Sequence, residues 1–372
     1  MKGSTDLLVS ILVLKVVEGF LLSGSCQKRC LQAYTPSLIC QCNAECNQHG
    51  NCCPDFHLAC EGGDKSCVSR CLSNYDPSAT CQCNTACSSH SNCCSDFSTA
   101  CGGGSSTSHT SITQATLADR LWTMDPDKFD TQDVHLNLGG HTYAGNTQDR
   151  SPLPLFTSVN SNLLARPIYT TLFSLYNNYQ PQLGVSDPLD GSDKVEIGHF
   201  LDVVMASPVI KETHTYLVDH GLYTGDMAAF RKKIFSLWFE PYSRSKGKPR
   251  DSSAFEHVFV GEYKGTKTEG LHNWVRFYSE EKAGHINYLG YSKYRGQQMV
   301  KFPFTWNGHY KDTNSFIVGS SPAFDMALGT VCYLTKPNSE CDFSLNGNQF
   351  RIKQWDASNA AGPQLATAYV VF

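Results

Sequence analysis

The stretch FEHVFVGEYKGTKTEGLHNWVRFY spans residues 255–278 and carries two histidines, His257 and His272, on which the interpretation of this chain depends. β-branched and aromatic residues follow each histidine in runs of strand length, so each histidine is expected to begin a strand. The Gly- and Lys-rich segment 261–270 between the two runs is typical of a hairpin loop. The two strands are therefore expected to be neighbours, with their imidazoles close to each other.

Two neighbouring imidazoles suit the cleavage of RNA. That reaction takes a proton from the 2′-hydroxyl group and gives a proton to the 5′-oxygen that leaves. A histidine can do either near neutral pH, because its ordinary pKa is about 6.5. Glu256 or Glu262 could orient one ring or raise its pKa. Lys311, which follows a predicted strand and a tight turn, could stabilise the charge that develops on the phosphate.

These five residues also have ordinary interpretations. The chain contains 13 histidines, and most histidines and lysines in proteins are solvated or take part in packing. Three signatures of other hydrolases are missing from this region: the HExxH of zinc proteases, the GxSxG nucleophile elbow and the GxxxxGK[ST] phosphate loop. A protease is the least favoured enzyme class, because the sequence offers no nucleophile with its base.

The chain has a different character on each side of this stretch. Upstream, residues 114–240 place apolar side chains at helical spacing in three segments, which contain Leu117 and Leu121; Ile168, Leu172, Leu175 and Tyr176 after Pro167; and Phe230, Ile234 and Trp238. Downstream, runs of strand length recur at 257–263, 274–280, 286–291, 300–306, 315–320, 350–355 and 366–372. One further helix is expected at 321–334, with Ser321 as N-cap and Pro322 at its first position. A helical half followed by a strand-rich half predicts an α+β domain over residues 114–372.

Sixteen of the 18 cysteines lie between Cys26 and Cys101 and form an internal repeat. Each copy has too few apolar residues to build a stabilising core, so it is expected to depend on four disulfides. Zinc is a less favoured use of these cysteines in an oxidising compartment, and the spacing alone leaves the pairing open. A shift of 41 residues superimposes Cys26, Cys30, Cys40, Cys42, Cys46, Cys52, Cys53 and Cys60 on Cys67, Cys71, Cys81, Cys83, Cys87, Cys93, Cys94 and Cys101.

The N-terminus agrees with an oxidising compartment. Lys2 precedes the apolar run 7–14 and a stretch of small residues, as in a signal peptide; an uncleaved anchor is the alternative. No later segment is long and apolar enough for a membrane span, so a soluble, secreted protein is expected. The expected organisation is a signal peptide at 1–24, disulfide-rich repeats at 25–62 and 63–102, a flexible linker at 103–113 and the α+β domain at 114–372.

The charge of the chain argues against bulk attraction of nucleic acid, since the net charge is −4. A local site is compatible with that charge. The run RSKGKPR at 244–250 places Arg244, Lys246, Lys248 and Arg250 together without an acidic residue. Such a run could hold phosphates, although a solvated basic loop is the simpler interpretation. The two remaining cysteines, Cys332 and Cys341, are interpreted as a local disulfide that closes a turn.

Each cysteine-rich repeat resembles the somatomedin B family, whose pattern C-x3-C-x9-C-x-C-x3-C-x5-C-C-x6-C both copies match throughout. The resemblance implies a particular disulfide pairing. The implied pairs are Cys26 with Cys42, Cys30 with Cys60, Cys40 with Cys53 and Cys46 with Cys52, and the same pairs 41 residues later.

The larger region resembles the uridylate-specific endoribonuclease (EndoU) family from about residue 114 to the end. The resemblance is carried by FEHVFVGE, by LHNWVRFY with EEK after it, by IVGSSPAFDMALGTVCYL and by the terminal ATAY. Secreted animal members of the family, such as placental protein 11, also carry somatomedin B repeats before this domain. The resemblance implies cleavage of single-stranded RNA at uridines, stimulated by Mn²⁺, that leaves a 2′,3′-cyclic phosphate.

The same resemblance implies roles for individual residues. His257, His272 and Lys311 match the catalytic residues, although HYKD around the lysine departs from the family's pattern. By analogy with the related coronaviral enzyme, His272 is the general base and His257 the general acid. Ser315 and Tyr369 match the residues that recognise uracil; the alternative is that Ser315 begins a strand and Tyr369 fills a core. The metal ligands stay unidentified, because no group of carboxylates and histidines has clear ligand spacing.

Two functions of different classes follow. The first is a secreted, monomeric endoribonuclease that acts on single-stranded RNA and uses its somatomedin B repeats to dock on an extracellular protein. The second is a secreted binding protein without enzymatic activity that acts through the repeats. The first is favoured, because all three positions that match catalytic residues are filled in this sequence.

Overall fold

In the computed structural model the chain forms two units, Met1–Thr110 and Ser111–Phe372. In the second unit the structure describes residues 113–372 except 245–248 and 359–361. In the first unit it describes residues 26, 29–30, 32–36, 38, 40–49, 51–53, 56, 60, 67, 75, 77, 79–84, 86–87, 90–95 and 97. The predicted signal peptide, and nearly all of the predicted linker, lie outside these residues. No helix in the described part of the chain has the length and hydropathy needed to cross a membrane.

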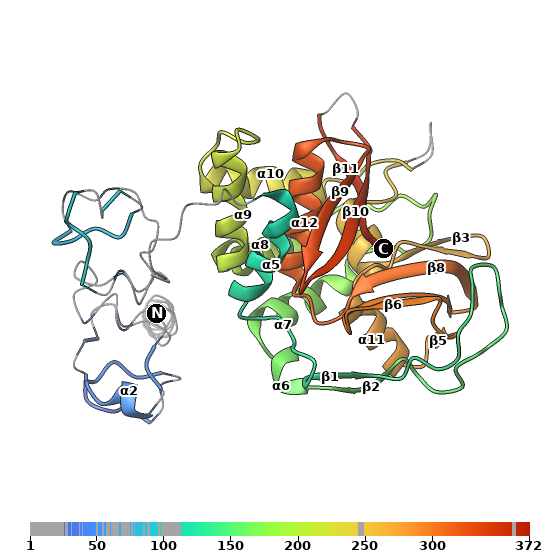
Figure 1. Ribbon diagram of the computed structural model, residues 1–372, viewed down its shortest axis with the longest axis horizontal. Helices are drawn as coiled ribbons and strands as arrows, with labels where there is room; N and C mark the ends of the chain where they lie inside the picture. Colours follow the sequence, from blue (N-terminus) through green and yellow to red (C-terminus); the bar gives the residue numbers. More distant parts are fainter. Residues whose placement is uncertain are drawn as a thin grey trace, which may run out of the picture. The chain divides into compact units, whose positions relative to one another are not determined.

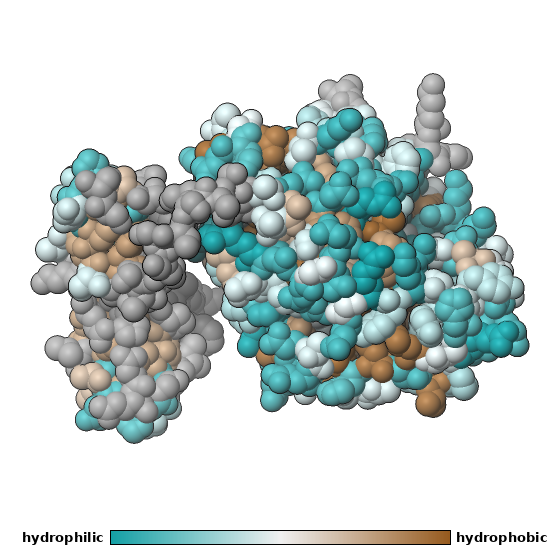
Figure 2. Space-filling view, viewed as in Figure 1, coloured by the Kyte–Doolittle hydropathy of each residue, from teal (hydrophilic) through white to brown (hydrophobic). Residues whose placement is uncertain are grey.

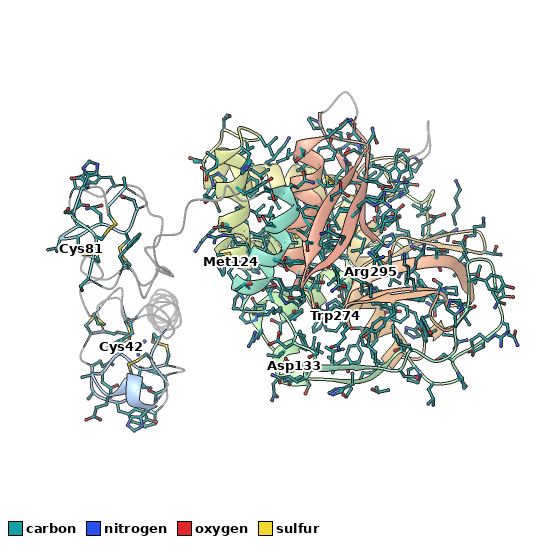
Figure 3. All side chains as sticks on the ribbon, viewed as in Figure 1. Cys42, Cys81, Met124, Asp133, Trp274 and Arg295 are labelled. Carbon is teal, nitrogen blue, oxygen red and sulfur yellow. A yellow bond between two sulfur atoms is a disulfide. The ribbon has the colours of Figure 1, made fainter. Side chains whose placement is uncertain are left out.

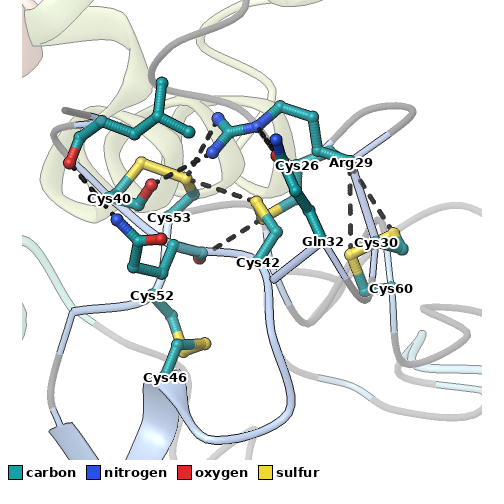
Figure 4. The surroundings of a disulfide bond; sticks show 12 residues. Cys26, Arg29, Cys30, Gln32, Cys40, Cys42, Cys46, Cys52, Cys53 and Cys60 are labelled. Atoms are coloured by element: carbon teal, nitrogen blue, oxygen red, sulfur yellow. Dashed lines mark hydrogen bonds between the residues drawn. A yellow bond between two sulfur atoms is a disulfide. The ribbon is translucent and has the colours of Figure 1, made fainter. Parts of the chain in front are cut away.

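The first unit contains the two cysteine-rich repeats, and cystines form their interior (Figure 3). The backbone of both repeats is bonded in the same way. In the first repeat Gln41 donates its N–H to Asn51, and in the second Gln82 donates to Asn92. The helix α2 (Cys46–His49) lies in the first repeat. Figure 4 shows Arg29 beside the cystines of this repeat, where its guanidinium donates to the carbonyl of Cys40 and to the side chain of Gln32.

The disulfide pairing agrees with the one that the somatomedin B resemblance implies. The eighth implied pair, Cys71 with Cys101, lies outside the described residues. The seven pairs present are Cys26–Cys42, Cys30–Cys60, Cys40–Cys53, Cys46–Cys52, Cys67–Cys83, Cys81–Cys94 and Cys87–Cys93.

The described residues of the second unit form three sheets (Figure 1). Strands β1 (Val134–Leu136) and β2 (Phe156–Val159) form a pair. The largest sheet has the order β3-β4-β8-β7-β5, with β6 paired to β7; its strands are β3 (Glu262–Lys264), β4 (Lys267–Glu269), β5 (Ile286–Tyr288), β6 (Lys293–Arg295), β7 (Met299–Trp306) and β8 (His309–Ile317). The third sheet has the order β11-β10-β9, from β9 (Glu340–Leu345), β10 (Asn348–Asp356) and β11 (Leu365–Val371).

Helices α5, α8, α9, α10 and α12 gather beside the three-stranded sheet (Figure 1). The helices of this unit are α5 (Gln114–Met124), α6 (Ser161–Leu164), α7 (Pro167–Ser174), α8 (Gly191–Ala206), α9 (Pro208–Asp219), α10 (Met227–Phe239), α11 (Trp274–Lys282) and α12 (Pro322–Thr335), with a 3-10 turn η1 (Leu175–Asn177) and a π-helical turn η2 (Glu256–Val260). Ser321 caps α12 and Pro322 occupies its first turn, as predicted. The disulfide Cys332–Cys341 joins the end of α12 to β9, so this prediction is also confirmed.

Apolar side chains fill the interior of the second unit, and the face shown in Figure 2 is mainly hydrophilic. Aromatic residues hold the layers together. Trp238 of α10 packs against Phe259 of η2 with ring centroids 5.8 Å apart, and its indole N–H donates to Thr330 of α12 at 3.0 Å. Gly329 is required there, because a Cβ atom at this position would lie 2.8 Å from the Trp238 ring. The α+β class is confirmed.

Two predicted strands and the extent of the predicted helical half are wrong. Residues 257–260 form the π-helical turn η2 and not a strand; every residue of this turn is buried, so no alternation of exposed and buried side chains could reveal its period. Residues 274–280 form helix α11, because the side chain of Asn273 accepts the N–H of Arg276 and caps it. Residues 125–160 are irregular apart from β1 and β2, so the upstream half is helical only in part.

Candidate active site

A cavity of about 630 Å³ opens in the second unit where β11 of the three-stranded sheet lies against β8 of the six-stranded sheet. His257, His272, Lys311 and Tyr369 all line it. They come from four different places: η2, the residues before α11, β8 and β11. The fold thus brings together three predicted catalytic residues and one of the two predicted uracil-binding residues.

The two histidines are neighbours because their backbones are hydrogen-bonded to each other. Leu271 donates its N–H to the carbonyl of His257 at 2.7 Å, and His272 donates to Val258 at 2.8 Å. The two segments that carry the histidines cross so closely that a Cβ atom at Gly270 would lie 1.9 Å from the carbonyl oxygen of His257. Gly270 and Leu271 both have positive φ angles, a strained conformation for leucine that often occurs at functional sites. The two imidazole centroids are 5.7 Å apart, and the segment between them in sequence, which was predicted as a loop, contains the short hairpin β3–β4.

His257 is held by Glu262, one of the two acids expected to support the histidines. Its Nδ1 lies 2.7 Å from Oε2 of Glu262, which also pairs with Nε of Arg244 at 3.0 Å. Glu262 has no exposed surface, so both bonds lie in a medium where electrostatic interactions are strong. Burial lowers the pKa of His257 well below its ordinary value, and the charges of Arg244 and Lys311 add to this.

His272 stacks on Tyr369, with ring centroids 4.8 Å apart and planes 12° from parallel. Its pKa is also lowered well below the ordinary value, by burial first and then by the charges of Lys311 and His257. The nearby carbonyl of Ser315 raises the pKa of His272 and offsets part of this decrease. Both imidazoles are therefore mainly neutral near pH 7 before an anion binds.

Lys311 lies on β8 after the turn at Asn307 and Gly308, as the sequence predicted. Its ammonium group donates to the carbonyl of Gly270, beside the crossing of the two histidine segments. Burial lowers the pKa of Lys311 to about 7, against a raising effect of Glu269. The lysine is thus a cation that can lose its charge near neutral pH.

Two predicted residues have contacts other than those expected. Ser315 is buried within β8, does not line the cavity, and donates its hydroxyl to the carbonyl of Val370 at 2.5 Å. Uracil recognition by Ser315 stays a prediction that requires this hydroxyl to turn. Glu256 is buried, and its hydrogen bonds do not reach either histidine ring; burial and the neighbouring Glu262 raise its pKa well above the ordinary value. Its role in supporting the histidines also stays a prediction.

The cavity contains residues that sequence reasoning did not connect with the histidines. Arg244 was noted as part of a basic run, and here it lines the cavity and pairs with Glu262. Lys246 and Lys248 lie outside the described residues. Thr367 lines the cavity two residues before Tyr369, and Trp355, which is 48% exposed, lies at its edge. An outward-facing tryptophan on a strand is the signal that could have identified Trp355.

No set of metal ligands is recognisable in the described residues. The groups of three ligand atoms found there are Cys26, Cys42 and Cys53 and their equivalents in the second repeat, and all of these sulfurs are in disulfides. Near the histidines, Glu262 is already engaged by His257 and Arg244. These residues do not fit a resident Mn²⁺ ion, so no chemical step is assigned to one.

The family model for Endoribonuclease XendoU matches residues 113–370. The chain belongs to the XendoU endoribonuclease family. The model for the Somatomedin B domain matches residues 24–63 and 65–104. Among individual XendoU relatives, the uridylate-specific endoribonuclease of Mus musculus is 34% identical over 94% of this chain and 78% of its own length. The uridylate-specific endoribonuclease of Paralichthys olivaceus is 38% identical over 89% of this chain and 89% of its own length.

A solved structure supports the same assignment. The structure titled "The structure of XendoU: a splicing independent snoRNA processing endoribonuclease" matches 69% of this chain and 96% of that chain, with a TM-score of 0.60 and 32% sequence identity. The cavity that contains the two histidines therefore belongs to a domain of the XendoU endoribonuclease fold.

Proposed function

We propose that this protein cleaves single-stranded RNA on the 3′ side of uridines, by attack of the 2′-hydroxyl group on the adjacent phosphate, and leaves a 2′,3′-cyclic phosphate. The observation that carries the proposal is the convergence of His257, His272 and Lys311 on one cavity. Its relatives named uridylate-specific endoribonuclease support the choice of uridine.

His272 takes the proton from the 2′-hydroxyl, and His257 gives one to the 5′-oxygen that leaves. The bond from Nδ1 of His257 to Glu262 leaves Nε2 as the ring atom that exchanges a proton with the substrate. Two neutral imidazoles cannot both perform these roles, so His257 must gain a proton when RNA binds. A bound phosphate favours this, because its negative charge offsets those of Lys311 and Arg244, which hold the pKa of His257 low.

Lys311 stabilises the extra negative charge on the phosphate oxygens in the transition state. Tyr369 positions His272 through the stacked rings and leaves its edge to the ribose or the uracil. Glu256 and Glu262 keep the segment of His257 in place, and Ser315 contributes to uracil recognition if its hydroxyl is released from Val370.

The disulfide-rich repeats and the apolar N-terminal run favour secretion after removal of residues 1–24. We assign docking on an extracellular protein to the repeats at 25–62 and 63–102. Residues 103–113 form the linker. Catalysis belongs to the domain at 114–372, which acts as a monomer. Tyr34 and Tyr75 support a docking role, because they occupy equivalent positions of the two repeats and are 60% and 66% exposed. Docking alone, without catalysis, is the competing function.

The test uses the mature protein and a short single-stranded RNA that contains one uridine, with and without Mn²⁺, and identifies the product ends by mass. A 2′,3′-cyclic phosphate at the uridine, absent with His272→Ala and present with the control His199→Ala, supports the proposal. His199 is an exposed residue of α8 that does not line the cavity. Intact RNA under every ion condition would reject the enzyme and favour the docking function.

A further inference from the structure

The two site histidines differ in what holds ring nitrogen Nδ1. In His257, Nδ1 lies 2.7 Å from the side-chain carboxylate of Glu262. In the described part of the chain, Nδ1 of His272 is buried and has no hydrogen bond of ordinary geometry, although the carbonyl of Ser315 lies near the ring. A buried polar nitrogen is costly without a partner, so this atom is expected to have one in solution.

A second, small cavity of about 20 Å³ borders His272 and Tyr369. Most of its walls are apolar side chains, and the one carboxylate among them belongs to Asp325. One water molecule needs about 10–15 Å³ of such space and two or more polar partners. The cavity is therefore of a size for a single water, and His272 and Asp325 are the polar groups that such a water would meet.

Asp325 lies in the first turn of α12 and has no part in the chemistry proposed above. The side-chain amide of Asn273, the residue next to His272, donates to Oδ2 of Asp325 at 3.1 Å. Asp325 retains some accessible surface although its neighbours in α12 are buried, as expected for a carboxylate that borders a cavity. The carboxylate is thus oriented by the segment that carries His272.

We propose that one ordered water in this cavity joins Nδ1 of His272 to the carboxylate of Asp325, which makes Asp325 a positioning residue for the general base. The Nδ1–H donates to the water, and the water donates to Asp325. This arrangement fixes the tautomer in which Nε2 is unprotonated and can accept the 2′-hydroxyl proton. The proposal rests on the proposed function, in which His272 is the base.

Charged groups around the pair come from several elements. His272 faces Lys311 of β8, His257 of η2 and Arg244 before η2. Asp325 interacts with Asp125 at the end of α5, and burial raises the pKa of Asp325 to about 7. The groups that face His272 are unaltered in the variants below, and Asp125 is altered only in the control, so a pH profile that changes in Asp325→Asn is traceable to Asp325 or to the water.

The experiment compares the full-length protein with Asp325→Asn, by the pH dependence of kcat on a uridine-containing RNA and by ¹⁵N NMR of the histidine rings. We expect kcat to fall about 10-fold with KM within about 2-fold. Since burial raises the pKa of Asp325 to about 7, the loss of kcat should be largest above pH 7, where the carboxylate is charged in the parent. The His272 resonances should change from the Nδ1–H tautomer to a mixture.

Two further variants separate positioning from folding. Asp125→Asn removes a second buried carboxylate of the same region that does not line the cavity, so kcat and the tautomer above pH 7 should stay as in the parent. Val258→Ile adds a methyl group to a residue that borders the cavity, and by displacing the water it should reproduce the loss of kcat and the mixed tautomer of Asp325→Asn without a change of charge.

An unchanged kcat and tautomer in Asp325→Asn, or in Val258→Ile, would overturn the water-mediated contact. If Asp325→Asn does not fold, Val258→Ile decides alone. Absence of RNA cleavage by the parent protein would overturn the proposed function instead, and the NMR measurement would still report on the contact.

Discussion

The two units of this chain are stabilised by different physical means. Among the described residues of the first unit, the buried side chains are nearly all half-cystines, with Phe56 as the large apolar exception. The second unit has a continuous core with large aromatic residues such as Trp238 and Trp274 in its interior (Figure 3). Its described residues contain a single disulfide, Cys332–Cys341.

This difference bears on function. Cross-links stabilise a small module without much burial, so large side chains such as Tyr34 and Tyr75 stay exposed and available for contacts. A reactive site needs the opposite, because the low pKa values of His257 and His272 depend on burial. We therefore expect catalysis to depend on packing in the second unit and to be insensitive to the cystines of the first.

The largest effect expected is that of removing a histidine. His257→Ala and His272→Ala should each lower kcat about 10²–10⁴-fold, because each removes a proton-transfer group. Thermal unfolding should show that the second unit stays folded. Single-turnover cleavage of the uridine-containing RNA measures the effect, with His199→Ala as the matched control; parental activity in either variant would remove that histidine from the mechanism.

Lys311→Ala should cost about 10²-fold in kcat through the loss of transition-state charge stabilisation. Lys311→Arg gives a sharper test through pH. Since burial lowers the pKa of Lys311 to about 7, the lysine of the free protein is charged below that pH and loses its charge above it, so kcat/KM of the parent should decline from pH 7 upward. Arginine stays charged, and its alkaline limb should move to higher pH. An unmoved limb would assign the titration to another group.

Glu262→Gln should lower kcat about 10-fold, because the charged partner of both His257 and Arg244 is lost while the shape is kept. Glu340→Gln is the matched control, since Glu340 also pairs with an arginine, Arg351, but at the surface. The comparison of kcat for the two variants tests whether the buried pair acts on catalysis. Equal rates would limit Glu262 to a structural role.

The smallest effect on catalysis is expected from the repeats. The double variant Cys40→Ser with Cys53→Ser removes a disulfide of the first repeat, a loss that costs about 2–5 kcal/mol in small secreted domains. Protease sensitivity of the first unit should rise sharply while RNA cleavage stays within about 2-fold. Cys332→Ser with Cys341→Ser should instead lower the Tm of the second unit. Loss of cleavage in the first variant would show that the units act together.

Sequence patterns predicted these regions unequally well. The eight-cysteine spacing alone left the pairing open, and the somatomedin B resemblance supplied the pairs, with which the disulfides of the described residues agree. Around His257 and His272 the predicted strands were wrong. The aromatic and β-branched residues of these segments favour strands locally, but packing on all sides of η2 and the Asn273 cap of α11 outweigh that preference.

The sequence by itself determined the cysteine repeat, the α+β class, the Cys332–Cys341 disulfide and the cap of α12, since these follow from local spacing and residue type. Only the tertiary structure decided which groups face one another. Tyr369 stacks on His272 from 97 positions away along the chain (369 − 272), and Arg244 reaches Glu262 across η2. The contact between Tyr369 and His272 depends on how β11 lies against β8. The order of neighbouring residues along the chain carries no information about that arrangement.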